Sequence, residues 1–377
     1  MSSHPDKPTF AFNRNDYHPP PDYKVTQSPL SSRWAPRNWN KKTWIGISIA
    51  AIILLVVIIV AAVVGSQNNA YPNYTALQYT LTDTYAGTDF FDNFDYFTGY
   101  DPTHGFVHYV PNTTAIQYNL TYASEKSAVL RVDTTEQDAS TGRFSVRISS
   151  KKQYDQGLFV FDVKHAPYGC STWNALWLAD ETDWPANGEI DVIESVNRGT
   201  SGVQSTLHTT NHCKMSNIKR HQTGQTLTTN CWNATDSNAG CGVQGPQETY
   251  GSAFNAAAGG IYACELRSAG IRIWFFPRDN IPSDIPSDIT NTSAPDPSNW
   301  PTPLADFPNT HCDINRHFRN QSIIANIDLC GDWAGAASVY SGEGGCPGTC
   351  AGFVAGNATA FGEAFWEWGG WRVYSAR

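Results

Sequence analysis

The chain has 377 residues, of which 41% are hydrophobic and 13% aromatic, and its formal net charge is −9. This length can fill at least one large hydrophobic core, and the acidic balance argues against a nucleic acid or an anionic polymer as ligand. The charge is unevenly distributed, because residues 1–43 carry a net +4 and the remainder −13. We therefore expect a change of environment near residue 44.

The first segment, residues 1–43, holds seven prolines, including the run Pro19-Pro20-Pro21, and shows no apolar periodicity. A segment of this composition cannot bury enough apolar surface to offset the entropy that is lost on ordering. We predict a disordered tail, which either carries a sorting signal or is simply solvated.

Residues 44–65 are expected to form a membrane anchor. Ile45–Val64 is a run of twenty uncharged residues, long enough as a helix to cross about 30 Å of hydrocarbon. Lys41 and Lys42 precede this run, whereas the first charge after it is Asp83, so the positive-inside rule places the N-terminus in the cytosol. A cleaved signal peptide is the alternative, which the 43-residue leader and the length of the apolar run disfavour.

All cysteines and all glycosylation sequons lie beyond the predicted anchor. Nine cysteines are compatible with an oxidising compartment, and an odd number allows at most four disulfides. The pairing stays open, but Cys264 is our candidate for the free thiol because Ile261–Leu266 reads as a buried strand. We expect a single-pass type II membrane protein whose later residues are lumenal or extracellular, in the secretory pathway, at the plasma membrane or in the cell wall. The seven Asn-x-Ser/Thr sequons begin at Asn73, Asn112, Asn119, Asn233, Asn291, Asn320 and Asn357.

Residues 66–78 are expected to be a short linker and residues 79–377 a single all-β domain. Short runs of β-branched and aromatic residues recur between clusters of Gly, Asn, Asp and Pro, and no stretch predicts an amphipathic helix of several turns. A two-sheet antiparallel sandwich is the simplest solution, with Pro277–Pro308 as a surface loop. The expected strands include Ala128–Asp133, Arg143–Ser149, Gly157–Val163, Ile261–Leu266, Ile271–Phe276, Ile323–Ile327 and Trp371–Tyr374.

Three carboxylates fall in the strand-like segment 189–194. Side chains alternate along a strand, so Glu189 and Asp191 share a face, whereas Glu194 joins them only if a β-bulge adds one residue at Val192–Ile193. Two carboxyls about 5–5.5 Å apart on one surface are typical of a retaining glycosidase. The alternative is an ordinary strand with a polar outer face.

Aromatic residues before and after the acidic strand are candidates for sugar binding, because sugar rings stack their apolar faces on aromatic rings. Most of the 13 tryptophans must belong to the core, but Trp173, Trp177 and Trp184 lie in a loop-rich segment just upstream of the acids. His208 lies on the strand expected to follow, where it either contacts the substrate or has a purely structural role.

The motif Trp-Pro-Ala-Asn-Gly-Glu-Ile-Asp-Val-Ile-Glu at 184–194 resembles the active site of glycoside hydrolase family 16, in the form associated with laminarinase-type endo-β-1,3(4)-glucanases. The resemblance covers nearly the whole chain after the anchor, and the matching segments are similar to the fungal branch of the family. It implies a bent, concanavalin A-like β-jelly-roll with substrate across the concave face. Further matching segments are Phe90–Asp92, Asp101–Gly105, Gly251–Asn255, Trp274–Arg278 and Cys330–Gly335.

The resemblance also implies residue roles. Glu189 would be the nucleophile, Glu194 the general acid/base, and Asp191 would hydrogen-bond the nucleophile and help to set its ionisation. Trp177 would form the floor of the sugar-binding subsite on the non-reducing side of the scissile bond. The chemistry requires no cofactor and no metal, although some family members carry a structural calcium away from the cleft. Further sugar contacts would be Arg147 and His208 in the cleft, and Trp333 on the leaving-group side.

Three hypotheses follow, all for a protein expected to be monomeric with β-glucan as its partner. The first is an anchored, retaining endo-β-1,3(4)-glucanase. The second is a β-glucan transglycosylase or glucan-assembly factor of the cell wall, which uses a sugar acceptor in place of water. The third, a non-catalytic glucan-binding protein, is disfavoured because both glutamates are present. Linkage preference, hydrolysis against transfer, and cleavage of the anchor stay open.

Overall fold

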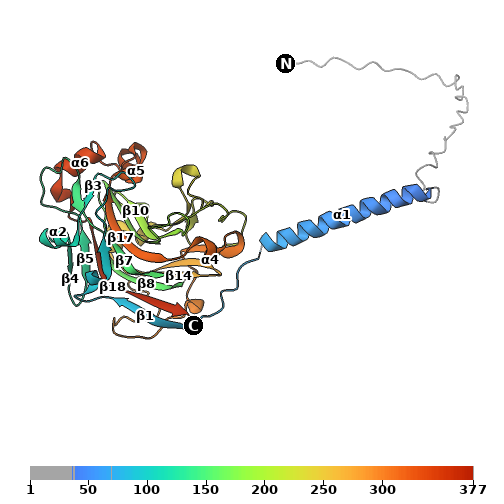
Figure 1. The fold of residues 1–377 in the computed structure, drawn as a ribbon, viewed down its shortest axis with the longest axis horizontal. Helices are drawn as coiled ribbons and strands as arrows, with labels where there is room; N and C mark the ends of the chain where they lie inside the picture. Colours follow the sequence, from blue (N-terminus) through green and yellow to red (C-terminus); the bar gives the residue numbers. More distant parts are fainter. Residues whose placement is uncertain (1–35, 37–38, 69, 377) are drawn as a thin grey trace, which may run out of the picture. The chain divides into compact units, whose positions relative to one another are not determined.

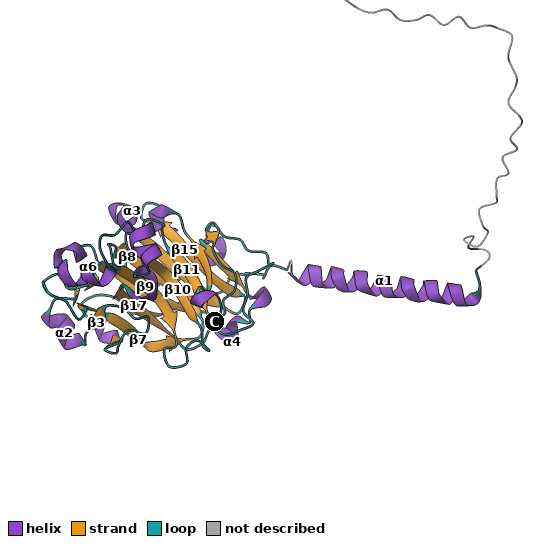
Figure 2. Cartoon of the chain, turned by 90° about the horizontal axis from the view of Figure 1, so that it is seen from above, coloured by secondary structure: helices purple, strands orange, loops and turns teal. Residues whose placement is uncertain are grey.

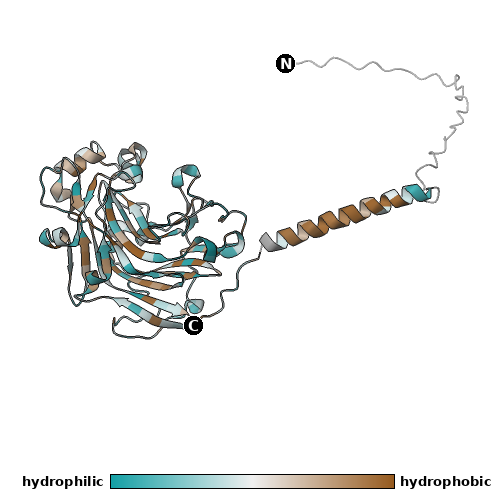
Figure 3. Cartoon of the chain, viewed as in Figure 1, coloured by the Kyte–Doolittle hydropathy of each residue, from teal (hydrophilic) through white to brown (hydrophobic). Residues whose placement is uncertain are grey.

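The computed structural model describes residue 36 and residues 39–68 and 70–376. Most of the predicted tail, residues 1–35 and 37–38, lies outside the described residues. The apolar segment forms one helix, α1 (Lys41–Asn68), and Figure 3 shows that most of this helix is hydrophobic. By length and composition, Lys41–Ser66 is able to cross a membrane.

The second compact unit of the chain, residues 64–377, is built on two eight-stranded antiparallel sheets (Figure 1). We call the first the back sheet. Its strands run in the order β16-β15-β14-β8-β18-β5-β4, and β1 also pairs with β18. These strands are β1 (Tyr79–Tyr85), β4 (Thr121–Ala123), β5 (Ala128–Arg131), β8 (Gly157–His165), β14 (Gly260–Arg267), β15 (Gly270–Pro277), β16 (Ala305–Pro308) and β18 (Phe365–Ala376).

The second sheet, which we call the front sheet, carries the acidic strand near its middle. Its order is β12-β13-β11-β10-β9-β17-β7-β2. A separate parallel pair joins β3 (Val107–Tyr109) and β6 (Arg143–Ser145). The front-sheet strands are β2 (Phe94–Tyr96), β7 (Arg147–Tyr154), β9 (Thr172–Ala179), β10 (Glu189–Val196), β11 (Gln204–His208), β12 (Gln225–Thr226), β13 (Cys241–Gln244) and β17 (Gln321–Leu329).

The main hydrophobic core lies between the two sheets. Leu176 and Ile190 of the front sheet belong to the same buried cluster as Phe159, Phe161 and Trp371 of the back sheet. This packing uses one face of each sheet and leaves the other face of the front sheet for polar side chains. The predicted two-sheet antiparallel sandwich is confirmed.

Helices are minor in this unit. Within residues 70–376 every α-helix is shorter than eight residues, and Figure 2 shows these helices around the edges of the sheets. They connect strands rather than cover a sheet, which agrees with the absence of an amphipathic pattern in the sequence. They are α2 (Asn112–Gln117), α3 (Gly251–Ala256), α4 (Ile314–His317), α5 (Gly331–Ala334) and α6 (Cys350–Gly356), and one π-helical segment, η8, spans Ser338–Glu343.

The predicted surface loop Pro277–Pro308 covers the outer face of the back sheet. Ile285 and Trp300 from this loop pack with Trp274 and Phe276 of β15. The prediction is wrong for the last four residues of the loop, because they form the edge strand β16. An edge position tolerates Pro308, which has no N–H to donate to a neighbouring strand.

Four disulfides form, and Cys264 is free and buried, as the sequence predicted. The pairing itself could not be predicted. Two of the disulfides, Cys170–Cys346 and Cys330–Cys350, hold residues that flank β9, α5 and η8. The pairs are Cys170–Cys346, Cys213–Cys312, Cys231–Cys241 and Cys330–Cys350.

The segment expected to be a linker, residues 66–78, makes specific contacts with the sandwich. Helix α1 continues to Asn68, and beyond it the hydroxyls of Tyr71 and Tyr74 donate to the two oxygens of Asp306 on β16, at 3.0 and 3.3 Å. The Arg272 guanidinium lies 4.1 Å from the centre of the Tyr74 ring. Residues 71–74 are therefore held against β15 and β16, whereas the domain boundaries stay a prediction.

Candidate active site

The acidic strand contains the predicted bulge. Asp191 pairs with Trp177 of β9, but the next residue of β9, Leu176, pairs with Ile193, so Val192 is the extra residue. Val192 and Ile193 both belong to the buried core. Glu194 consequently returns to the face that carries Glu189 and Asp191.

A tight turn leads into this strand. Gly188 has φ = +75°, and a Cβ atom there would lie only 2.2 Å from the carbonyl oxygen of His317. Glycine is the residue that tolerates both the left-handed backbone and the close approach. The Asn187-Gly188 step thus sets where β10 begins, and Glu189 is its first residue.

The three acids differ in burial. Asp191 is 2% exposed and Glu194 8% exposed, whereas Glu189 is half-buried. The pKa of Glu194 is raised to about 7: burial raises it most, the hydrogen bond from the Trp173 indole opposes the rise, and the charge of Glu189 adds to it. Burial, together with the negative charges of Glu189 and Glu194, raises the pKa of Asp191 well above its ordinary value. The site therefore holds two acids that retain protons at pH values where an exposed carboxylate is ionised.

Each glutamate accepts a hydrogen bond from one indole. Trp173 on β9 donates through Nε1 to Glu194 Oε1 at 2.7 Å, and Trp184 donates through Nε1 to Glu189 Oε2. Both tryptophans were expected to be sugar platforms. Sequence reasoning missed these N–H contacts because strand alternation predicts the face of a residue but not the direction of its indole N–H.

His208 lies opposite Glu189 on the neighbouring strand β11. Its Nε2 is 3.5 Å from Asp191 Oδ2, and its Nδ1 is 3.0 Å from Asn238 Oδ1. Among the described residues, Asp191 Oδ2 is buried without a hydrogen-bond partner. The structure therefore places His208 beside the acids, and its role as a sugar contact stays a prediction.

Trp177 and Arg147 form a second group on the same sheet. Trp177 Nε1 donates to Asn326 Oδ1 of β17 at 2.9 Å, and the Arg147 guanidinium lies 4.9 Å from the Trp177 ring centre. Arg147 is 8% exposed, is paired with Glu181 and lies 4.8 Å from the Phe97 ring centre. The Arg147 guanidinium thus packs against the Trp177 ring, and its role as a sugar contact stays a prediction. Sequence reasoning missed the neighbouring residues Asn326, Glu181 and Phe97.

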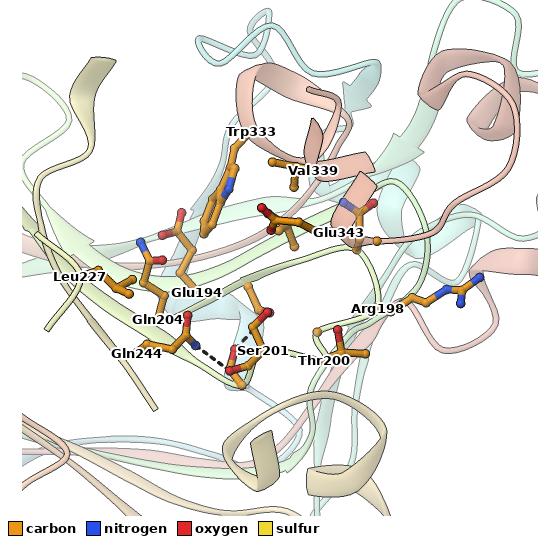
Figure 4. Close-up of a pocket in the computed structure, with 16 residues that line it drawn as sticks. Glu194, Arg198, Thr200, Ser201, Gln204, Leu227, Gln244, Trp333, Val339 and Glu343 are labelled. Atoms are coloured by element: carbon orange, nitrogen blue, oxygen red, sulfur yellow. Dashed lines mark hydrogen bonds between the residues drawn. The ribbon is translucent and has the colours of Figure 1, made fainter. Parts of the chain in front are cut away.

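Glu194 also lines a cavity of about 270 Å³ (Figure 4). Trp333 of α5 forms one wall, and its ring meets that of Trp173 edge-to-face with centres 5.8 Å apart. Figure 4 shows Glu343 of η8 across from Gln204 and Gln244, and Gln244 donates to the carbonyl oxygen of Ser201 at 2.9 Å. Gln204, Gln244 and Glu343 carried no sequence signal, because the cavity joins segments far apart in the chain.

Within the described residues, no group of three or more His, Cys, Asp or Glu side chains is placed to hold a metal ion. Carboxyls with unlike proton affinities, flanked by aromatic rings and a polar cavity, suit acid/base and nucleophilic chemistry on a carbohydrate.

Residues 94–374 match the family model described as the XgeA-like, catalytic GH16 domain. The chain belongs to glycoside hydrolase family 16. This agrees with the resemblance found in the motif and with the antiparallel sandwich.

Two curated relatives extend the comparison of this GH16 chain. A probable glycosidase of Schizosaccharomyces pombe is 48% identical over 300 residues, which cover 79% of this chain and 69% of the relative. An endo-1,3(4)-β-glucanase of Arthroderma benhamiae is 38% identical over 305 residues, covering 78% of this chain and 65% of the relative. The chain thus spans about two thirds of the length of these two relatives.

Two solved structures share the fold of this GH16 chain. Laminarinase 16A from Phanerochaete chrysosporium, with β-glucans in its donor and acceptor sites, is 46% identical with a TM-score of 0.75 and covers 79% of this chain and 99% of that chain. An elongating family 16 β-1,3-glucosyltransferase is 39% identical with a TM-score of 0.71 and covers 79% of this chain and 100% of that chain. The neighbours thus include a hydrolase and a transferase on one scaffold.

Proposed function

We propose that this family 16 enzyme is a retaining endo-β-glucanase acting on β-1,3 or mixed β-1,3/1,4 glucan. The observation that carries the proposal is the bulge at Val192, which aligns Glu194, with its pKa of about 7, on one face with Glu189. An acid that still holds its proton near neutral pH, beside a second carboxyl, is the arrangement that a retaining glycosidase needs.

The proposed mechanism is a double displacement. Glu189 attacks the anomeric carbon while Glu194 gives its proton to the departing glycosidic oxygen, which leaves a glycosyl ester on Glu189. Glu194, now ionised, takes a proton from water as the water oxygen attacks the anomeric carbon, which breaks the bond between that carbon and Glu189 and releases the carboxylate. Asp191 hydrogen-bonds Glu189 and, with its raised pKa, does so as a neutral donor.

The proposed substrate class rests on the aromatic groups and on the relatives. Trp177, supported by Arg147, would bind the glucan on the non-reducing side, and Trp333 would bind it on the leaving-group side. His208 and Trp184 would contact the sugar nearest the acids. Relatives named endo-1,3(4)-β-glucanase and laminarinase support β-glucan as the polymer.

A transglycosylase is the second candidate, favoured by the cavity beside Glu194. The cavity lies where a leaving or incoming sugar would sit, and its polar lining of Gln204, Gln244 and Glu343 suits hydroxyl groups. A sugar bound there would compete with water for the glycosyl ester on Glu189. The similarity to an elongating glucosyltransferase supports the same idea.

We further propose that α1 is a type II anchor and that residues 79–377 form a lumenal or extracellular catalytic domain, which would bring the enzyme to wall β-glucan. The basic residues before α1 support this orientation. Six of the seven sequon asparagines are exposed, and Asn233 is half-buried. Endoglycosidase treatment of the full-length protein tests the orientation: a loss of mass is expected, and an unglycosylated chain that proteases digest from the cytosolic side contradicts it.

The activity is tested with the detergent-solubilised full-length chain on laminarin, lichenan and a labelled acceptor oligosaccharide. New reducing ends that disappear in Glu189→Gln support the hydrolase. Acceptor elongation without net reducing ends supports the transglycosylase instead. If wild type and Glu189→Gln bind glucan equally and neither turns it over, the chain is a binding protein and both proposals fail.

A further inference from the structure

Trp173 lies between the proposed acid/base and the proposed leaving-group platform. Its Nε1 donates to Glu194 Oε1 at 2.7 Å, and its ring meets Trp333 edge-to-face. Its strand β9 pairs with β10 on one side and β17 on the other. The residue is therefore fixed by backbone pairing on both sides, whereas its indole joins two side chains of the site.

The chemistry of the indole limits what this contact can do. An indole N–H is a donor only, so the oxygen it contacts must accept. In neutral Glu194 the accepting Oε1 therefore cannot carry a proton directed at Trp173. The carbonyl oxygen of a neutral carboxyl is its better acceptor, so this contact favours the acidic proton on Oε2, the oxygen left free of this hydrogen bond.

Trp173 is also excluded from the wall of the cavity. Trp333, Gln204 and Glu343 line the space beside Glu194, and Trp173 does not. The N–H of Trp173 is committed to Glu194 and its ring to Trp333, so the contacts that the structure gives it are with side chains of the site. Its sugar-binding role stays a prediction.

We propose that Trp173 is a positioning residue that selects Oε2 of Glu194 as the proton-transferring oxygen and holds it next to the sugar on Trp333. The inference rests on the proposed role of Glu194 as acid/base. Proton transfer to the glycosidic oxygen then occurs from one oxygen in one orientation, which reduces the reorganisation needed at the moment of reaction.

The electrostatic surroundings of Glu194 predict the direction in which its pKa changes when the Trp173 donor is removed. Burial and Glu189 raise the pKa of Glu194, and the N–H of Trp173 lowers it because it stabilises the ionised carboxylate. Removing this donor therefore raises the pKa of Glu194 and moves the alkaline limb of activity to higher pH, since that limb reports loss of the acid's proton. The other charged and titratable groups around Glu194 and Trp173 are unchanged by the substitution. They are Asp191 and Glu189 on β10, His208 on β11, Asp328 on β17, Arg198 and Glu343 in the cavity lining and Tyr250 in the core.

The test compares W173F with W184F in the full-length protein, because each removes one indole N–H from a different glutamate. In W173F we expect the alkaline limb of the pH profile to shift to a pH about one unit higher. We expect kcat to fall about tenfold, as for a lost hydrogen bond to a charged group. KM is expected to change less than about threefold. In W184F the alkaline limb stays at its wild-type position.

An alkaline limb that does not move in W173F overturns the proposal. So does a rise in KM at constant kcat, because that result makes Trp173 a sugar platform. If W173F does not fold, 3-benzothienylalanine at position 173 replaces the N–H by sulfur at nearly constant shape, and the same shift is required. Any glucan turnover, hydrolytic or transferring, serves for the profile; a wild type without turnover refutes the proposed function rather than the role of Trp173.

Discussion

Three acids of similar intrinsic chemistry are differentiated by their surroundings. Glu194 is buried against Trp173, Glu189 is half-buried and contacts Trp184, and Asp191 is enclosed between them. Burial and mutual repulsion raise the pKa of Asp191 and of Glu194, so protons stay on these two residues. Environment, rather than residue type, therefore distinguishes the proposed acid/base from the proposed nucleophile.

Asp191→Asn tests the claim that Asp191 acts as a neutral donor. Asn also donates without charge, so we expect the variant to retain most of its kcat/KM, whereas Asp191→Ala loses about 10–100-fold with the hydrogen bond to Glu189. Steady-state kinetics on laminarin measure both. Equal losses in the two variants contradict a neutral Asp191.

The same substitution has a consequence for stability. Because the folded-state pKa of Asp191 is raised, the native state keeps this proton to higher pH than the unfolded chain does. Stability is therefore lost as pH rises from the ordinary carboxyl range toward the raised pKa. We expect Asp191→Asn to have a higher unfolding midpoint than wild type at pH 7 and an unchanged one near pH 3.

At the scale of elements, the bulge in β10 is the feature on which the site depends. Val192 is the extra residue relative to β9, and its removal restores strict alternation. Deletion of Val192 leaves only Ile193 between Asp191 and Glu194, so alternation keeps Glu194 on the acidic face and turnover should persist. Deletion of both Val192 and Ile193 should direct Glu194 into the core and lower turnover at least about 10²-fold, the usual contribution of a general acid. Reducing-end assays measure this loss.

A further control for the double deletion is Val192→Ala. It keeps the residue count of β10, so it should remain active although its smaller side chain lowers stability. Full turnover in the variant that lacks both Val192 and Ile193 would show that alternation along β10 does not orient Glu194. Far-UV circular dichroism on both variants separates a misdirected Glu194 from an unfolded sandwich.

The contact between residues 71–74 and β16 is a second element whose effect can be measured. Asp306 is fully buried and accepts from Tyr71, Tyr74 and the backbone N–H of His221. Tyr74→Phe leaves one oxygen of a buried carboxyl without this donor, which should lower the free energy of unfolding by about 1–3 kcal/mol.

Chemical denaturation of full-length variants in detergent checks the effect of Tyr74→Phe. Tyr100→Phe is the control, because Tyr100 is 98% exposed and should be neutral. Equal stability of the two variants means that the residues before β1 do not stabilise the sandwich through Asp306.

At the scale of the whole molecule, the all-β class, the two-sheet sandwich, the bulge and the free Cys264 were predictable from the sequence. These properties depend on alternation, strand composition and cysteine number, which are local or countable. The indole contacts, the Asp306 contacts, the disulfide pairing and the cavity were not predictable. Each joins side chains that are distant in the chain, such as Trp173 and Trp333, and alternation contains no information about such partners.

Membership of family 16 does not decide between hydrolysis and glycosyl transfer. A hydrolase and a transferase share this scaffold, and both would pass through the same glycosyl ester on Glu189. The two differ only in what enters the cavity beside Glu194. The ester is therefore the claim that both candidate functions have in common.

Trapping that ester is the most direct test of the account. The full-length protein is incubated with a 2-deoxy-2-fluoro laminaribiosyl fluoride, which slows release of the ester, and is then digested for peptide mass spectrometry. We predict one added disaccharide on the peptide that contains Glu189, and none in Glu189→Gln. A label on another residue, or turnover with inversion at the anomeric carbon and no label, contradicts Glu189 as the nucleophile of a retaining enzyme.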